Sequence, residues 1–142
     1  MRAHLMGYEM AIPPSVVHDH APLHGEAARD IARLTIRTSG ALGELLGREL
    51  FSVPALDMLL DLYARADCRP MSLTGLCGAT SAPPRTALNM INRMVDRGIL
   101  ERAPDPDDGR RILVRFSPEG VLLVQDICRT IFALWRPPNT AV

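Results

Sequence analysis

The first half of the chain carries apolar positions at helical spacing. Between residues 25 and 50 an apolar stripe recurs every three to four positions, and most of the arginines fall outside it. This period predicts a helix over 25–50. Glycines in its second half weaken it by about 1 kcal/mol each relative to alanine; either the helix is interrupted near Gly40, or small residues there allow another helix to approach. A second helix is predicted over 52–66, because Ser52 is a good N-cap and Pro54 suits the first turn.

Residues 71–98 have the pattern of two short helices in tandem. Ser72 can cap the first, and Gly78 breaks it. Thr80 or Ser81 is expected to cap the second, with both prolines of the pair at 83–84 in its first turn. This second helix is predicted over 81–97, with Gly98 just beyond its end and apolar positions at helical spacing: Ala87, Leu88, Ile91, Met94 and Val95.

The period then changes from helix to strand. Residues 99–103 suit a strand, 104–109 form a turn-rich tip, and 111–116 alternate well enough for a returning strand. Ser117 and Pro118 then open a last helix that runs to about Trp135. The expected fold class is mainly α (α+β): a winged helix-turn-helix, that is, helix, turn, helix and a β-hairpin wing.

The last helix is apolar most of the way round. Over 121–135 the polar residues are Gln125, Asp126, Arg129 and Thr130. Such a helix is either a central core helix or part of a subunit interface; we favour an interface with the 25–50 helix of each protomer. We therefore expect an N-terminal arm over 1–24, and one domain over 25–142. Within it, 25–50 and 117–136 are dimerisation helices, and 52–116 form a DNA-binding lobe.

Composition fits an ordinary globular protein. The 142 residues suit a single domain, 47% are hydrophobic and 23% are charged, which excludes a disordered chain, a collagen and a small disulfide scaffold. No apolar run reaches the roughly 18–20 residues that span a bilayer. No secretory signal is visible, so we expect a cytoplasmic protein. The cysteine count of three is odd and no pair has metal-ligand spacing, which indicates reduced thiols.

The charge distribution is compatible with a nucleic-acid partner. Sixteen basic residues, all arginine, balance sixteen acidic ones. Residues 69–116 hold eight arginines against five carboxylates, a local surplus of three. A neutral chain with one basic region suits DNA binding.

The second tandem helix has the side chains expected of a helix that recognises bases in the DNA major groove. A major groove about 12 Å wide admits one helix, whose early side chains meet base edges. Arginine binds guanine or phosphate, asparagine binds adenine, and hydroxyls suit phosphate oxygens. At the hairpin tip, an arginine side chain can reach a neighbouring minor groove or the backbone. The predicted DNA-contacting residues are Ser72, Ser81, Arg85, Thr86, Asn89, Arg93, Arg110 and Arg111.

Three segments together resemble the MarR family of transcriptional regulators. They are Asn-Arg-Met-Val-Asp-Arg-Gly-Ile-Leu-Glu-Arg over 92–102, Asp-Pro-Asp-Asp-Gly-Arg-Arg over 105–111, and Val-Arg-Phe-Ser-Pro-Glu-Gly over 114–120. The resemblance covers roughly 28–135. It implies a homodimer, built from the terminal helices, that reads a pseudo-palindromic double-stranded DNA operator, commonly as a repressor. It also implies that Asp107 or Asp108 holds the wing arginine.

The resemblance further implies release from DNA by a small-molecule effector, an oxidant or a metal. An effector pocket between the dimer helices and the DNA-binding lobe would be lined by Leu34, Leu56, Leu60 and Tyr63, although core packing explains these residues equally well.

Other chemistry is weakly indicated. His18, His20 and His24 could bind a metal together with Asp19 or Glu26, but a histidine-bearing arm without metal is the simpler interpretation.

Cys68 and Cys77 could sense oxidants, yet nothing nearby predicts a lowered thiol pKa, and burial explains them better. No catalytic motif or phosphate loop appears, so we expect neither an enzyme nor a cofactor. The alternative function is a winged-helix module that binds protein without DNA. It would need an apolar or acidic recognition face, which Arg85, Asn89 and Arg93 argue against.

Overall fold

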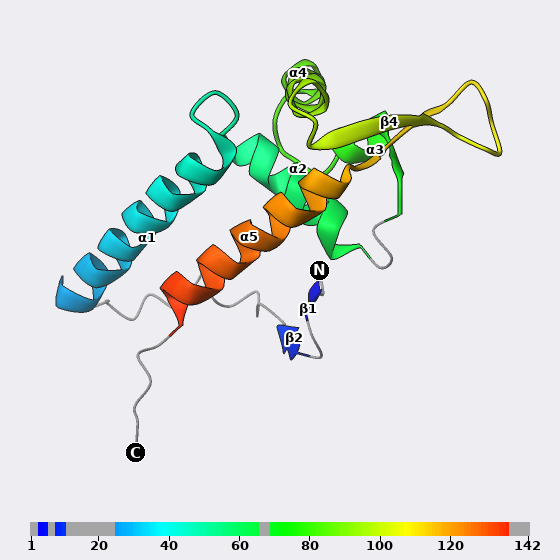
Figure 1. Cartoon of the computed structure of the whole chain (residues 1–142). Helices are drawn as coiled ribbons and strands as arrows, with labels where there is room; N and C mark the ends of the chain where they lie inside the picture. Colours follow the sequence, from blue (N-terminus) through cyan, green and yellow to red (C-terminus); the bar gives the residue numbers. More distant parts are fainter. Residues whose placement is uncertain (1–2, 6–7, 11–24, 66–68, 137–142) are drawn as a thin grey trace.

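Long helices and one small sheet build the chain (Figure 1). The computed structural model describes residues 3–5, 8–10, 25–65 and 69–136. The helices are α1 (Gly25–Leu46), α2 (Val53–Ala64), α3 (Leu73–Cys77), α4 (Pro84–Asp96) and α5 (Pro118–Trp135). The strands that follow α2 are β3 (Met71–Ser72), β4 (Leu100–Pro104) and β5 (Ile112–Phe116). Helices α1 and α5 lie side by side, and α4 and the β4–β5 hairpin lie beyond one end of this pair. The expected mainly helical, winged helix-turn-helix fold class is confirmed.

Helix α1 passes through Gly40 without interruption and ends earlier than predicted, at Leu46. Gly47 follows with a φ of +79°, a left-handed conformation that glycine adopts without penalty. The chain then turns, and the N–H groups of Leu50 and Phe51 bond to the Gly47 carbonyl. Gly43 faces the Phe51 ring at 3.7 Å from where a Cβ would lie, so the small residue admits this side chain.

The predicted serine caps are confirmed. The Ser52 hydroxyl accepts a bond from the Ala55 N–H at 3.5 Å, and the Ser72 hydroxyl accepts one from the Gly75 N–H at 3.0 Å. The Ser117 hydroxyl likewise accepts from the N–H of Gly120 at 2.9 Å and starts α5. Each cap satisfies an N–H group that has no partner within its helix.

The start of α4 differs from the prediction. The helix begins at Pro84, and Pro83 occupies the cap position with φ −54° and ψ 144° and no side-chain cap bond. The helical region is disfavoured for a residue before proline, so Pro83 stays extended and the helix begins at Pro84. Thr80 does not cap α4; its hydroxyl accepts the N–H of Ala82 at 3.3 Å in the preceding turn. Ser81 lies in the same turn.

The wing hairpin is confirmed, and the sheet includes a strand that was not predicted. The order is β3-β5-β4, with all neighbours antiparallel. The two-residue strand β3 is too short to show a period. The arm over 1–24 also contains two short strands, β1 (Ala3–Leu5) and β2 (Tyr8–Met10), which pair antiparallel where no element was predicted.

The core lies where α2, α3, α4, the hairpin and one end of each long helix meet. In α5, the buried residues are Gly120, Val124 and Ile127, all in its first ten residues. The large side chains Phe132 and Trp135 near its end are exposed. Helix α5 is therefore not the central core helix of the first alternative. In the described ranges, no helix has the length and hydropathy needed to cross a membrane. The division into arm, dimerisation helices and DNA-binding lobe remains a prediction.

Candidate nucleic-acid interface

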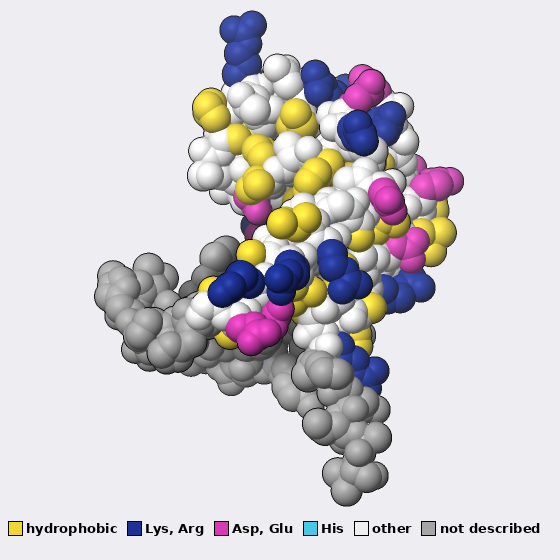
Figure 2. Space-filling model, turned by 90° about the vertical axis from the view of Figure 1, so that its left-hand side faces the viewer, with side chains coloured by type: hydrophobic (Ala, Val, Ile, Leu, Met, Phe, Trp, Pro, Cys, Tyr) yellow, Lys and Arg dark blue, Asp and Glu magenta, His cyan; other side chains and the backbone are white. Residues whose placement is uncertain are grey.

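Helix α4 presents a polar surface to solvent at its N-terminal end. Its opposite face is fixed by three buried side chains, Ala87, Ile91 and Met94. Figure 1 shows α4 at the edge of the molecule, and basic side chains protrude at the same height in Figure 2. The predicted groove-facing residues are all exposed: Ser81, Arg85, Thr86 and Asn89. Three side chains that suit base edges and phosphates thus lie near the start of α4, and Ser81 lies in the turn before it.

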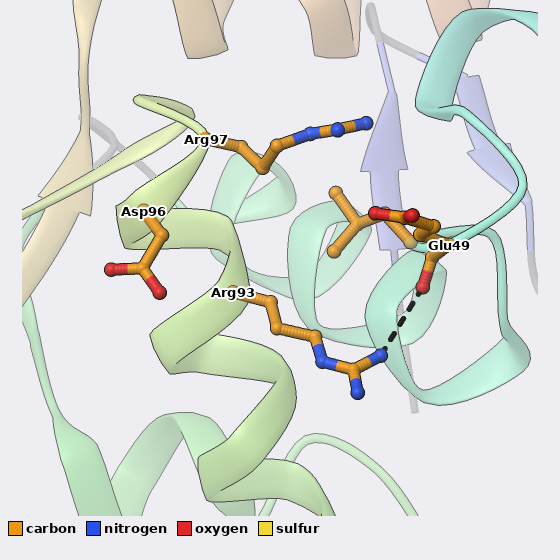
Figure 3. A pocket seen from close by; sticks show the side chains of 5 residues that line it. Glu49, Arg93, Asp96 and Arg97 are labelled. Atoms are coloured by element: carbon orange, nitrogen blue, oxygen red, sulfur yellow. Dashed lines mark hydrogen bonds between the residues drawn. The ribbon is translucent and has the colours of Figure 1, made fainter.

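Arg93 on α4 and Arg97, just beyond the end of this helix, lie against the end of α1 and the turn that follows it (Figure 3). Arg93 Nη1 donates to the Glu49 carbonyl at 3.4 Å, and Arg97 Nη2 donates to the Leu46 carbonyl at 3.5 Å. Together with Leu50 and Asp96 they line an open hollow of about 510 Å³. The positive charge of Arg97 near the Leu46 carbonyl stabilises the C-terminal end of α1. Arg93, predicted to contact DNA, thus also has a contact within the protein.

Ser72, also in the predicted set, is half-buried, and its hydroxyl caps α3. It can still face a phosphate, since a hydroxyl has both a donor and two lone pairs. As DNA contacts, Ser72 and Arg93 remain predictions.

The tip of the wing is ordered by its aspartates. The Asp105 carboxylate accepts the Asp107 N–H at 2.9 Å, and the Asp108 carboxylate accepts the Arg110 N–H at 3.0 Å. Two backbone bonds close the loop: Asp105 N–H to the Arg111 carbonyl at 3.0 Å, and Arg111 N–H to the Asp108 carbonyl at 2.9 Å. Short aspartate side chains commonly hold turns in this way.

The aspartates therefore hold the backbone of the wing tip, where the resemblance implied a bond to an arginine side chain. Across the described ranges, no ion pair joins the guanidinium of Arg110 or Arg111 to a carboxylate. Both arginines are exposed. Their charge is available to a polyanion.

Sequence reasoning missed one contact between the wing and α4. The Arg102 guanidinium on β4 donates a hydrogen bond to Oδ1 of Asn92 on α4. Alternation along β4 places Arg102 on the same face as the buried Leu100. That alternation was visible in the sequence, but the partner depends on how the hairpin packs against the helix.

The four residues predicted to line an effector pocket line neither the hollow beside Arg93 and Arg97 nor a second hollow on α1 and the turn after it. Leu56, Leu60 and Tyr63 are half-buried and pack against the core, whereas Leu34 lies on α1. The Tyr63 ring meets Phe116 edge-on at 6.2 Å. The second hollow is lined by Ser39, Gly40, Gly43, Glu44, Gly47 and Arg48. An effector contact at the four predicted residues remains a prediction.

The cysteines that the structure describes have little thiolate character. Cys77 and Cys128 are half-buried, and burial raises the pKa of both thiols. Cys68 and the three histidines of the predicted metal alternative, His18, His20 and His24, lie outside the described residues. Within the part of the chain that is described, no three His, Cys, Asp or Glu side chains gather as metal ligands.

The fold matches solved structures of MarR-type proteins at low sequence identity. The DNA complex of MepR from S. aureus aligns with a TM-score of 0.66 at 16% identity, over 79% of this chain and 87% of that chain. Wild-type apo MarR from E. coli aligns at 0.53 and 19% identity, over 80% and 85%. The transcriptional regulator Tm0710 from Thermotoga maritima aligns at 0.55 and 17% identity, over 75% and 72%.

Comparison of the sequence alone finds fewer similar proteins than comparison of the structure. No protein-family model matches the chain. A riboflavin kinase from Thermococcus kodakarensis is 35% identical over 77 residues, which are 52% of this chain and 35% of the kinase. The chain thus spans about a third of that enzyme, whereas it matches most of the length of the regulators. The chain has the winged helix-turn-helix fold of the MarR and MepR transcriptional regulators.

Proposed function

We propose that the protein is a sequence-specific regulator of transcription that binds double-stranded DNA as a homodimer. The observation that carries the proposal is the exposed row Arg85, Thr86 and Asn89 at the start of α4, on a helix whose other face is fixed in the core. Proteins of the same fold have been solved with DNA: MepR from S. aureus, and a mutant MarR from E. coli with operator DNA.

The geometry of α4 suits a major groove. Its 13 residues span about 20 Å at 1.5 Å per residue, and its polar end is at the N-terminus. Arg85 can bind guanine or phosphate, and Asn89 can bind adenine. The exposed guanidinium groups of Arg110 and Arg111 at the wing tip suit an adjacent minor groove or its phosphates. Helix and wing together would contact two neighbouring grooves.

Exposed apolar side chains on α1 and α5 support the homodimer. Ile31 is 44% exposed, Ile36 72%, Phe132 67% and Trp135 48%. On the face shown in Figure 2, hydrophobic side chains lie open between charged ones. Large apolar side chains left exposed on two adjacent helices are typical of a subunit interface. In the proposed dimer these helices meet their copies and hold two α4 helices for two half-sites.

We further propose that the dimer is a repressor, which leaves DNA when a small molecule binds. The hollow beside Arg93 and Arg97 supports a signal of this kind, because an occupant would touch both α4 and the turn that follows α1. A shift of this turn would change how α4 is held relative to the dimer helices.

Selection of duplexes from a random DNA pool by the purified protein tests the function. We expect an enriched pseudo-palindrome with half-sites about 10–10.5 base pairs apart, and light scattering that reports two chains per particle. The fluorescence anisotropy of the selected duplex should rise on binding, with a scrambled duplex as the control. If no motif is enriched and neither duplex is bound at low salt, the proposal is wrong and the protein-binding alternative takes its place.

A further inference from the structure

We propose that Arg102 and Asn92 form a phosphodiester-binding site at the junction of α4 and the wing. The site is additional to the residues predicted from the sequence, and it rests on the proposed DNA binding. Arg102 would contact one backbone phosphate, and Asn92 would position its guanidinium.

The two residues join the elements that would enter neighbouring grooves. The Arg102 guanidinium donates to Oδ1 of Asn92, which links β4 to α4. In the sheet, Arg102 stands opposite Val114, on the hairpin face that packs against α4. Val114 is fully buried, whereas Arg102 is exposed, so the core ends between the two residues. Arg102 is therefore held at the rim of the joint between helix and wing.

Among the residues that the structure describes, no carboxylate neutralises the charge of Arg102. No carboxylate of the described residues lies within 4.0 Å of its guanidinium, which has only Asn92 as a hydrogen-bond partner there. Arg115 differs: it lies on the opposite face of the same hairpin and pairs with Glu101 at 3.2 Å. A guanidinium has five N–H donors, so Arg102 retains both charge and donors for an anion.

Asn92 suits a positioning role because it is neutral. Since arginine is only a donor, the amide oxygen must face it, and the amide NH₂ group is left for a second acceptor. A carboxylate at this position would hold the guanidinium more tightly and cancel its charge. The neutral amide orients the arginine and leaves the charge for a partner.

Duplex geometry identifies the partner as a backbone phosphate. The major groove and the adjacent minor groove are separated by one sugar–phosphate strand, which must cross between α4 and the wing when each enters its groove. Arg102 lies at that crossing. Asn92 follows Asn89 by three residues and Arg85 by seven, so the three share one side of α4. The pair is thus close to the surface proposed to read bases.

The test compares three variants by fluorescence anisotropy on the selected duplex and a scrambled duplex, over a range of salt concentrations. Arg102→Gln removes the charge and keeps a donor for Asn92. Asn92→Asp keeps Arg102 and neutralises its charge with an adjacent carboxylate. Arg115→Ala is the matched control on the opposite face. Circular dichroism melting of each variant reports the fold.

We expect Arg102→Gln to weaken both duplexes by a similar factor, about tenfold, and to lower the salt slope by about one. Asn92→Asp should also weaken DNA binding while its melting temperature is unchanged or raised, because a paired Arg102 no longer offers its charge to the phosphate. Arg115→Ala should bind as the wild type does.

Each failure points to a different conclusion. If the wild-type protein binds neither duplex, the proposed function itself fails. If it binds, and both Arg102→Gln and Asn92→Asp keep its affinity and salt slope, the phosphate site is wrong and the pair only braces the wing. If Arg102→Gln lowers the melting temperature, its loss of DNA binding cannot be assigned to the site. The DNA affinity and salt slope of Asn92→Asp then decide whether the phosphate site exists.

Discussion

The indole Nε1 of Trp135 donates a hydrogen bond of 2.9 Å to the hydroxyl of Thr38 and so ties the last turn of α5 to the middle of α1. The same hydroxyl donates to the Leu34 carbonyl at 2.8 Å. The link lies away from the core, on the part of the two helices that we propose as a dimer interface. It therefore fixes the mutual position of helices that the core anchors only at one end.

Thr38→Val should lower the free energy of unfolding by up to about 1 kcal/mol, because it removes the acceptor and leaves the indole N–H without this partner. Thr35→Val is the matched control, since its hydroxyl also donates to a helix carbonyl, that of Ile31 at 2.8 Å. Urea unfolding at fixed protein concentration measures both. Equal losses in the two variants would show that the Trp135 bond adds no stability.

Gly120→Ala should destabilise the protein by about 1–3 kcal/mol or more, the range of overpacked cores. A Cβ at Gly120 would lie 2.0 Å from the Ile99 carbonyl oxygen. That oxygen cannot shift easily, because it accepts two hydrogen bonds from Ser117: one from the backbone N–H at 3.0 Å and one from the side-chain hydroxyl at 3.1 Å.

The control for Gly120 is Gly40→Ala in the interior of α1, where nothing lies within 4 Å of the added carbon. It should stabilise the helix by about 0.5–1 kcal/mol. Thermal unfolding of the two variants should shift in opposite directions; a shift of the same sign and size would contradict the close approach at Gly120.

Gly47→Ala should cost more stability than Gly98→Ala. Both glycines have a left-handed backbone, with φ of +79° and +73°, and alanine pays a similar conformational cost at each. A Cβ at Gly47 would also lie 2.7 Å from Arg97 Nη2, whereas at Gly98 it would meet open space. The difference between the two in urea unfolding measures the displacement of Arg97. Equal free energies of unfolding in the two variants would mean that Arg97 moves aside without a loss of stability.

Arg85→Ala should weaken binding of the selected operator by about 1–3 kcal/mol and relax specificity at one base position, as expected for a bidentate base contact. Arg37 is an exposed arginine on α1, and Arg37→Ala should change neither the operator affinity nor the specificity. Anisotropy titrations with operator and scrambled duplex measure both effects. An equal loss on the two duplexes would exclude base reading by Arg85.

Arg110→Ala and Arg111→Ala should weaken binding and flatten its salt dependence, because each exposed wing arginine that contacts a phosphate contributes about 0.9 to the slope of log affinity against log salt. Titrations at several salt concentrations give the slope. If both variants keep the wild-type slope, the wing does not contact phosphates.

Local signals in the sequence predicted most elements. Ser52, Ser72 and Ser117 each cap a helix where the sequence placed a cap, and the period of Ala87, Ile91 and Met94 gave the buried face of α4. Strand β3 escaped prediction because two residues carry no period, and its place depends on pairing with β5.

By itself, the sequence determined the serine caps and the buried positions Ala87, Ile91 and Met94 of α4, because periodicity and capping act within a few residues along the chain. Only the tertiary structure decided what Arg93, Arg97 and Arg115 contact. Arg93 and Arg97 donate to carbonyls at the end of α1 and in the turn after it, more than forty positions away, and Arg115 pairs with Glu101 across a hairpin. Such partners follow from the packing of separate segments, which fixes where each guanidinium can reach.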